Sequence, residues 1–343
     1  MVKLTLLLIT ACCLAACQET EKTFDRQLAA PAGGRLRIDL DIGSASVIGS
    51  GSREVIIHAR MRGSDDDLSQ LTISTEQDPS GVTVIEHASP WHRWFVPATA
   101  RVQFTIEVPR DYPVVVKTTG GSLDLQNLHA SVQATTFGGS TTVRDVMGSV
   151  DARTYGGSIS VERLNGPATL TASGGAIRIS DATGDLDLHT VGGSIWLQKV
   201  DGQVNAATTG GSVSAATLGD HDISLLTFGG GIELTVPATI RASVDARTLG
   251  GSVRSDVALS NIVRAGPSSL SGTINGGGHS IRLQTTGGGI QLEPLLRPPV
   301  TGSTLQHAVL FEQRDEPIRL SETPGVLETW IDQPSGDPPN LSL

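Results

Sequence analysis

Pairs of adjacent glycines return at a fixed spacing through the middle of the chain, and this repeat limits the possible folds more than any other feature. The first six pairs begin 18 residues apart, and three more follow at looser spacing: Gly120-Gly121, Gly138-Gly139, Gly156-Gly157, Gly174-Gly175, Gly192-Gly193, Gly210-Gly211, Gly229-Gly230, Gly250-Gly251 and Gly287-Gly288. A short fixed period is typical of a solenoid, in which each repeat forms one coil. The sequence therefore predicts stacked coils over residues 118–293.

Apolar and polar residues alternate within each repeat. Counted from the first glycine as zero, positions 3, 5, 8, 12 and 14 are mostly apolar; position 8 is Leu128, Val146, Leu164, Ala182, Val200 and Leu218. Alternation with period two indicates a strand with one buried face. A second turn at position 10, as in Asn165-Gly166, divides each coil into two strands, because glycine tolerates positive φ.

These patterns predict an all-β fold: a single-stack parallel β-helix, or β-solenoid, with about 18 residues per coil and a β-rich N-terminal lead. Equivalent strands would pair in parallel about 4.8 Å apart, so that Ile159, Ile177 and Ile195 would form one internal column. The preference for right-handed β crossovers favours a right-handed helix. A hexapeptide helix would need apolar residues every six positions and a calcium roll would need a repeated aspartate, so both are disfavoured.

The N-terminus has the pattern of a secretory signal. Lys3 precedes an apolar stretch, Leu4 to Leu14, that is too short to span a bilayer as a mature helix. Leu14-Ala15-Ala16-Cys17 resembles the lipobox of bacterial lipoproteins, which implies palmitate-type lipidation of Cys17 after cleavage. Gln18 then implies the outer membrane, by resemblance to the sorting rule of enteric bacteria. An ordinary signal peptide with a chance cysteine remains the alternative.

The chain divides into five expected segments. They are a signal peptide (1–16), a tether (17–32), a β-rich N-terminal part with a cap (33–117), the β-helix repeats (118–293), and a C-terminal cap with a loose tail (294–343). Gly43-Ser44-Ala45-Ser46-Val47 has the pattern of a degenerate first repeat, and Asn261 to Gly278 that of a Gly/Ser-rich insertion forming a loop between coils.

Charge and aromatic content narrow the expected partners. The formal net charge of −10 argues against nucleic acid and against electrostatic docking on anionic lipid. We therefore expect membrane contact through the lipid anchor, and an envelope protein or a glycan as the partner. Trp91, Trp94 and Phe95 lie together between prolines in a chain that has four tryptophans. They either cap the open end of the stack or form an exposed patch for that partner.

No catalytic motif, metal site or cofactor is predicted. The best columns of polar residues contain Asp151 with Arg153 and Asp187 with His189, two coils apart, so the two pairs should not converge. Phe137 and Tyr155 occupy equivalent places one coil apart and are expected to pack by stacking at a turn, with a sugar-binding platform as the alternative. The predicted function is a non-catalytic structural or adhesive surface. An accessory role in envelope stress sensing or assembly, and a polysaccharide-active β-helix enzyme, stay open as alternatives.

The order of these features carries a resemblance. The step Ile106-Glu107-Val108-Pro109, followed by repeats of the form Gly-Gly-Ser-Ile-x-Val, resembles the bacterial putative-adhesin β-strand-repeat family of unknown function over residues 36–292. The resemblance implies the β-helix and a place in the cell envelope, since related domains occur in envelope stress operons of Gram-positive bacteria. It supplies no catalytic residues. The Cys17 motif and the Trp91–Trp94 loop depart from the family pattern.

Overall fold

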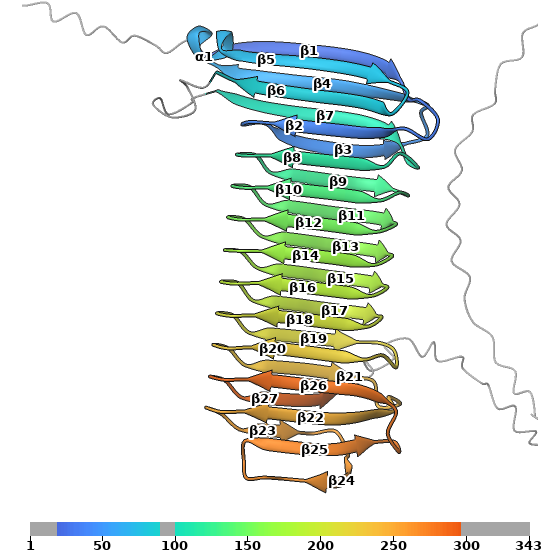
Figure 1. The fold of residues 1–343 in the computed structure, drawn as a ribbon, viewed down its shortest axis with the longest axis vertical. Helices are drawn as coiled ribbons and strands as arrows, with labels where there is room; N and C mark the ends of the chain where they lie inside the picture. The colour runs from blue at the N-terminus through green and yellow to red at the C-terminus, as the bar shows by residue number, and fades with distance from the viewer. Residues whose placement is uncertain (1–18, 90–99, 296–343) are drawn as a thin grey trace, which may run out of the picture. The chain divides into compact units, whose positions relative to one another are not determined.

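The chain forms two long β-sheets that enclose one core, as a computed structural model describes for residues 19–89 and 100–295. The strands lie crosswise in successive layers (Figure 1). Sheet A contains, in spatial order, β1 (Thr20–Ala29), β4 (Glu54–Gly63), β7 (Arg101–Pro109), β3 (Ser44–Ser50), β9 (Leu123–Leu128), β11 (Thr141–Met147), β13 (Ile159–Asn165), β15 (Ile177–Thr183), β17 (Ile195–Asp201), β19 (Val213–Thr217), β21 (Ile232–Val236), β27 (Ile290–Pro294) and β23 (Val253–Ser255).

Sheet B covers the other side of the core. In spatial order it contains β24 (Ser260–Val263), β25 (Ser269–Ile274), β22 (Ala242–Thr248), β26 (His279–Thr285), β20 (Ile223–Thr227), β18 (Val204–Thr208), β16 (Leu186–Thr190), β14 (Ala168–Ala172), β12 (Val150–Thr154), β10 (Val132–Thr136), β8 (Val114–Thr118), β2 (Arg35–Leu40), β6 (Gly81–Ala88) and β5 (Leu71–Asp78). One short helix, α1 (Asp65–Ser69), follows β4. The all-β prediction is confirmed.

The middle of the stack, from β9 to β20, is regular. Most strands there pair in parallel with the strand 18 residues further along the chain, so Ile159 lies beside Ile177 and Ile177 beside Ile195. All three side chains are fully buried. The predicted internal column is therefore confirmed, and it joins rows of valine, leucine and alanine in a single core.

A left-handed backbone residue lies within the sheet A strands of this region, one to two residues before each strand ends. Five non-glycine residues at position 7 have φ between 53° and 56°: Asn127, Asp145, Arg163, Asp181 and Lys199. This extra outward residue allows position 8 to point inward. No such residue occurs in β19, where Thr217 pairs with Val200 and is buried, while Leu218 is 48% exposed. The prediction that Leu218 faces the core was wrong for this reason.

A ladder of threonine hydroxyls fastens the Gly-Gly turns to one another. Thr136 donates its hydroxyl to the carbonyl of Gly121 at 2.8 Å and accepts the amide of Gly139 at 3.1 Å. The same pair of bonds recurs at Thr118, Thr154, Thr190, Thr208, Thr227, Thr248 and Thr285. The layers approach so closely here that a Cβ on Gly157 would lie 2.1 Å from the Gly139 carbonyl oxygen.

At the C-terminal end, the order of the layers in the stack differs from their order in the chain. After β20 and β21 it runs to β22 and β23, then returns through β26 and β27, which insert between the earlier pairs. Gly288 accordingly lies between Gly230 and Gly251 in the column of Gly-Gly turns. The stretch predicted as a loop, residues 261–278, instead contributes to β24 and to β25, which pair antiparallel at the end of sheet B.

Strands cover both ends of the stack in the described part of the chain. At the C-terminal end, β24 and β25 extend sheet B, and Val257 and Leu259 pack against the core. The described part of the predicted cap, residues 294–295, adds no cap of its own; residues 296–343 lie outside the described residues. At the N-terminal end the predicted tether was wrong from Thr20 onward, because residues 20–29 form β1 and pair with β4. Phe24 and Leu28 of β1 pack against the core.

The N-terminal layers are also out of chain order. The layer of β2 and β3 lies between the layer of β6 and β7 and the layer of β8 and β9. Within it, Ala45 pairs with Leu123 and Val47 with Leu125. The degenerate first repeat therefore stands directly on the first regular coil, as a repeat should, although about 80 residues separate the two in sequence.

Candidate functional surfaces

The candidate contacts Cys17, Trp91, Trp94 and Phe95 lie outside the described residues, but the strands that flank them are placed. Thr20, the first residue of β1, pairs with Gly63 of β4, and the adjacent Arg62 pairs with Arg101, the first residue of β7. The segment towards Cys17 and the end of the aromatic loop therefore join sheet A at the same end of nearby strands. Within the described residues, no helix is long and apolar enough to cross a bilayer.

Sheet B carries the two pairs that the sequence suggested as its best polar columns. Arg153 contacts Asp151 at 3.2 Å, and His189 contacts Asp187 at 3.1 Å. Thr169 lies between the two aspartates in the ladder, which sets them about 9.6 Å apart at two strand spacings. The pairs do not converge, as predicted. Both pairs are exposed, and exposed pairs of this kind contribute little to stability.

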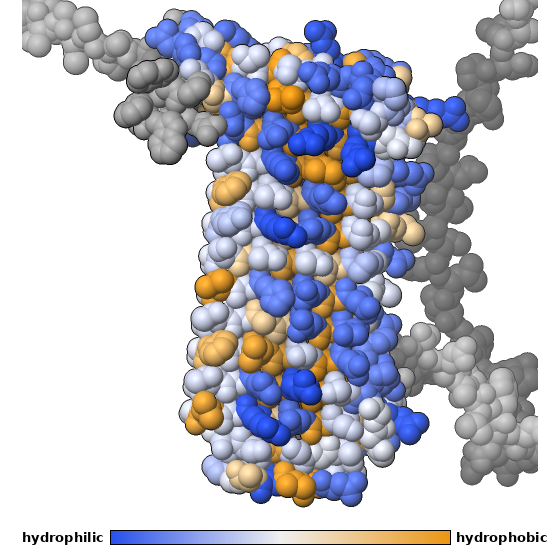
Figure 2. Space-filling view, viewed as in Figure 1, coloured by the Kyte–Doolittle hydropathy of each residue, from blue (hydrophilic) through white to orange (hydrophobic). Residues whose placement is uncertain are grey.

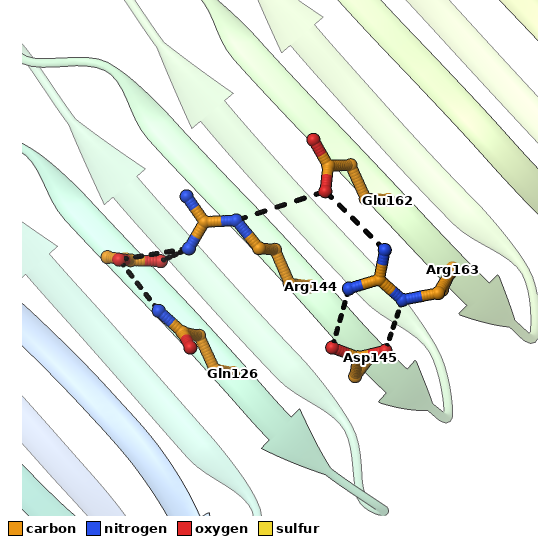
Figure 3. Close-up of polar contacts among 6 residues, drawn as sticks. Gln126, Arg144, Asp145, Glu162 and Arg163 are labelled. Carbon is orange, nitrogen blue, oxygen red and sulfur yellow. Dashed lines mark hydrogen bonds and ion pairs between the residues drawn. The ribbon is translucent and has the colours of Figure 1, made fainter. Parts of the chain in front are cut away.

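A polar network crosses three strands of sheet A, as Figure 3 shows. Arg144 of β11 contacts Asp124 of β9 at 2.9 Å and Glu162 of β13 at 4.0 Å. Arg163 contacts Asp145 through two hydrogen bonds, at 2.5 and 2.8 Å. These bonds lower the pKa of the Asp145 carboxyl, with the Arg163 hydrogen bond as the main cause. The network links neighbouring layers, and its side chains are between about one third and one half exposed to solvent.

Exposed apolar side chains follow the edge where the Gly-Gly turns lie. Five residues immediately before a glycine pair are more than half exposed: Phe137, Tyr155, Val191, Phe228 and Leu249. Figure 2 shows apolar groups spaced along this edge, on the left. The rings of Phe137 and Tyr155 are 4.6 Å apart and nearly parallel, so the predicted stacking is confirmed. We call these five residues the apolar edge.

The outer face of sheet A presents an aromatic group that the sequence analysis missed. Trp196 of β17 is 41% exposed, and the guanidinium of Arg178 lies 4.4 Å from its ring centroid. Shallow depressions lie on both sides of this tryptophan. The signal was present in the sequence: position 4 is otherwise polar or charged, and an arginine precedes the tryptophan by one coil. The alternation within each strand predicts only that Arg178 and Trp196 both point outward.

Glu86 is a buried carboxylate at the N-terminal end. Through the pairs Glu86–Leu40 and Leu40–Thr118 it continues the threonine column of the middle. One of its oxygens accepts the amides of Ile42 at 3.1 Å and Gly43 at 3.2 Å, as a threonine hydroxyl accepts one amide elsewhere. Burial raises the pKa of Glu86, against the effect of these two hydrogen bonds. Glu86 therefore has a structural role in this turn and does not belong to a cleft.

The described residues include no group of three or more metal-ligating side chains. Two histidine–aspartate contacts lie at the other edge of the stack, where His221 contacts Asp201 at 2.8 Å and His279 contacts Asp222 at 3.4 Å. The hydrogen bond from the Ser280 amide is the main cause of a lowered pKa at Asp222. These contacts are separate pairs, with the two histidine rings 6.4 Å apart.

The two sheets and the core that they share define a β-solenoid. The family comparison agrees: the chain belongs to the Toastrack DUF4097 family, whose model matches residues 37–293. This confirms the resemblance drawn from the repeats. A search of the curated proteins finds no match to the chain.

Several solved structures are similar to this chain over most of their length. A putative adhesin from Bacteroides fragilis shares 13% identity, with 80% of this chain and 97% of that chain covered and a TM-score of 0.33. A putative lipid binding protein from Parabacteroides distasonis shares 10%, with 79% and 96% covered and a TM-score of 0.39. A putative adhesin from Parabacteroides merdae shares 11%, with 80% and 97% covered and a TM-score of 0.32. The family assignment depends on the family match alone.

Proposed function

We propose that the chain is a lipid-anchored protein of the bacterial outer membrane, and that it presents a right-handed β-helix with about 18 residues per coil as a non-catalytic structural or adhesive surface. The observation that supports this best is the unbroken core that runs through both sheets. Such a core fixes the spacing of outward side chains over many layers. A rigid display of repeated side chains suits binding along an extended partner better than it suits a reaction centre.

The anchor fits the position of the first strand. Only Gln18 and Glu19 separate Cys17 from β1, and three residues reach at most roughly 11 Å. A lipid on Cys17 would therefore hold the N-terminal end of the stack close to the bilayer. The loop with Trp91, Trp94 and Phe95 joins β7 at the same end of sheet A. We assign to this loop a second contact with the envelope, because tryptophan is favoured at membrane interfaces.

The anchor is tested by comparing Cys17→Ser with the natural chain. We expect the natural protein to incorporate a labelled palmitate analogue and to fractionate with the outer membrane, and the variant to do neither. Recovery of Cys17→Ser in the outer membrane fraction would contradict the anchor.

Changing Trp91 and Trp94 together to alanine should weaken attachment while the melting temperature stays the same. Unchanged attachment would remove the loop from this account.

A second candidate function is an accessory role in envelope stress sensing or assembly, and the apolar edge supports it. Exposed apolar side chains that lie in a row are typical of a surface that contacts another protein. A photocrosslinking residue at Tyr155 should capture one envelope protein from intact cells, while the same residue at Thr169 on sheet B should not. Equal capture at both positions would count against this role. Release of product from a glycan would instead favour a polysaccharide-active enzyme.

A further inference from the structure

The indole ring of Trp196 is covered on one face and open on the other. Outward side chains of sheet A form rows along the stack, and Trp196 lies between Arg178 and Ser214 in its row. Arg178 stacks on the ring at 4.4 Å. Ser214 is too short to cover the opposite face. The result is a flat apolar surface whose orientation is fixed by the arginine behind it.

The depression next to the open face is lined by groups that form hydrogen bonds. Beyond Ser214 the row continues with Glu233 of β21, Gln291 of β27 and Arg254 of β23, and all of them line the depression with Trp196. Four strand spacings separate Trp196 from Arg254, which is about 19 Å. Hydroxyl, carboxylate, amide and guanidinium groups thus follow one aromatic ring in a line.

The inserted layer keeps these groups available. If β23 followed β21 directly in sheet A, Glu233 and Arg254 would be neighbours and could pair. Because β27 lies between them, Gln291 separates the two charges by two strand spacings, about 9.6 Å. Among the described residues, Glu233 has only a 3.5 Å contact from the Ser214 hydroxyl, and Arg254 has no ion pair. Arg254 can therefore bond a ligand without losing an ion pair, and Glu233 can do so by giving up one long contact. The amide of Gln291 already donates one hydrogen bond, to Glu293 at 2.6 Å, and has a second N–H for a ligand.

We propose that this row, Trp196 with Ser214, Glu233, Gln291 and Arg254, is a binding site for a neutral polysaccharide. A pyranose ring can lay its C–H face on the open indole, and its hydroxyls can donate to Glu233 and accept from Arg254 and Gln291. The opposite charges of Glu233 and Arg254 balance, which favours an uncharged sugar. This inference deepens the proposed binding function and depends on it.

The composition of the site favours a sugar over a protein. The apolar edge and the other exposed large apolar residues of the described chain do not line the depression; Trp196 is the one exposed apolar group that does. A protein interface would require a larger apolar centre. A carbohydrate needs one ring to stack on and several hydrogen-bonding groups around it, and this row supplies both.

The test measures binding of maltohexaose, cellohexaose and chitohexaose to the full-length protein in detergent by titration calorimetry. We expect at least one of them to bind, and Trp196→Ala to weaken that binding about tenfold or more. Ser214→Trp, which places a second ring over the open indole face, should weaken it without removing Trp196. Met147→Ala is the control, because Met147 is similarly exposed but lies at the end of β11, outside both the Trp196 row and the apolar edge; its affinity should match that of the natural chain.

Thermal melts of each variant separate loss of the site from loss of the fold. Binding that is unchanged in both Trp196→Ala and Ser214→Trp, or no binding of any of the three glycans, would overturn the proposal. So would a Trp196-dependent protein ligand in place of a glycan. The anchor experiment measures lipidation at Cys17 and does not depend on Trp196. Loss of glycan binding at Trp196 can therefore be distinguished from failure of the proposed envelope function.

Discussion

The middle of the stack and its two ends are built from the same kind of layer but in different chain order. From β9 to β21 each new layer follows the previous one in sequence and in space. At the C-terminal end, the layer of β26 and β27 comes later in sequence than the layer of β22 and β23 but lies inside it. At the N-terminal end, the layer of β2 and β3 comes earlier in sequence than the layer of β6 and β7 but again lies inside it.

The difference shows how a solenoid can protect its ends. In a simple solenoid each terminal repeat has one neighbour, so the last coil opens most easily. Here the last described strands of the chain, β26 and β27, have a paired strand on both sides. The outermost positions are left to short or antiparallel strands such as β24, whose residues are all exposed. The ends are therefore closed by topology as well as by side chains.

The largest predicted effect comes from a methyl group in the regular middle. A Cβ on Gly175 would lie 2.0 Å from the carbonyl oxygen of Gly157. Because both groups are backbone in adjacent layers, Gly175→Ala should lower the free energy of unfolding by about 3 kcal/mol, measured by urea denaturation. Gly51→Ala is the control, since its Cβ meets nothing within 4 Å, and it should change stability by less than about 0.5 kcal/mol. Equal losses would show that the turns are not closely packed.

The threonine ladder tests whether the inserted layer is equivalent to a regular one. Thr154 bonds Gly139 and Gly157, and Thr285 makes the corresponding bonds to Gly230 and Gly288. Thr154→Val and Thr285→Val should each cost about 1–3 kcal/mol in urea denaturation, because each leaves two backbone groups without the hydroxyl. A much smaller cost at Thr285 would mean that the inserted layer is only loosely held.

Ala172 provides the reverse experiment, because it interrupts the ladder between Thr154 and Thr190. Ala172→Thr places a hydroxyl near the carbonyl of Gly157 and the amide of Gly175. We expect the free energy of unfolding to rise by about 1 kcal/mol. A loss of stability in the same assay would show that the column has no room for a hydroxyl at this layer.

Glu86 is expected to give the smallest effect, and one that depends on pH. Burial raises its pKa above the usual value, so its contribution to stability is present below the usual pKa and is lost as the pH rises through the raised pKa. Glu86→Gln does not titrate. The free energy of unfolding of Glu86→Gln, minus that of the natural chain, should therefore increase between pH 4 and pH 8 in urea denaturation. A difference that is constant with pH, or that falls, would contradict the assigned shift.

The repeat was enough to predict most of the residues that face the core, with Leu218 as an exception, but it did not predict the order in which the layers stack. Ile159, Ile177 and Ile195 stack as predicted because their spacing and alternation leave one solution. All coils share that pattern, however, so it contains no information about the position of the Gly287-Gly288 coil. That position depends on a connection that turns back, which a sequence period cannot show. The tether was likewise mistaken for a linker because Phe24 and Leu28 are its only large apolar residues.

The candidate surfaces were less predictable than the core. The ion pairs and the Phe137–Tyr155 stack follow from residues one coil or two positions apart. The row at Trp196 combines residues of five strands, and it needs the inserted β27 to bring Gln291 between Glu233 and Arg254. Outward residues are not constrained by the core, so their pattern alone did not distinguish this row from any other polar column.

Hydrogen exchange of the native protein, followed by mass spectrometry, tests the layer order most directly. Leu283 of β26 and Leu188 of β16 are both fully buried in sheet B, one in the inserted layer and one in the regular middle. We expect amides of β26 to exchange as slowly as those of β16, and amides of β24 to exchange much faster. Exchange of β26 and β27 at the rate of β24, well ahead of the middle, would contradict an inserted and doubly paired layer.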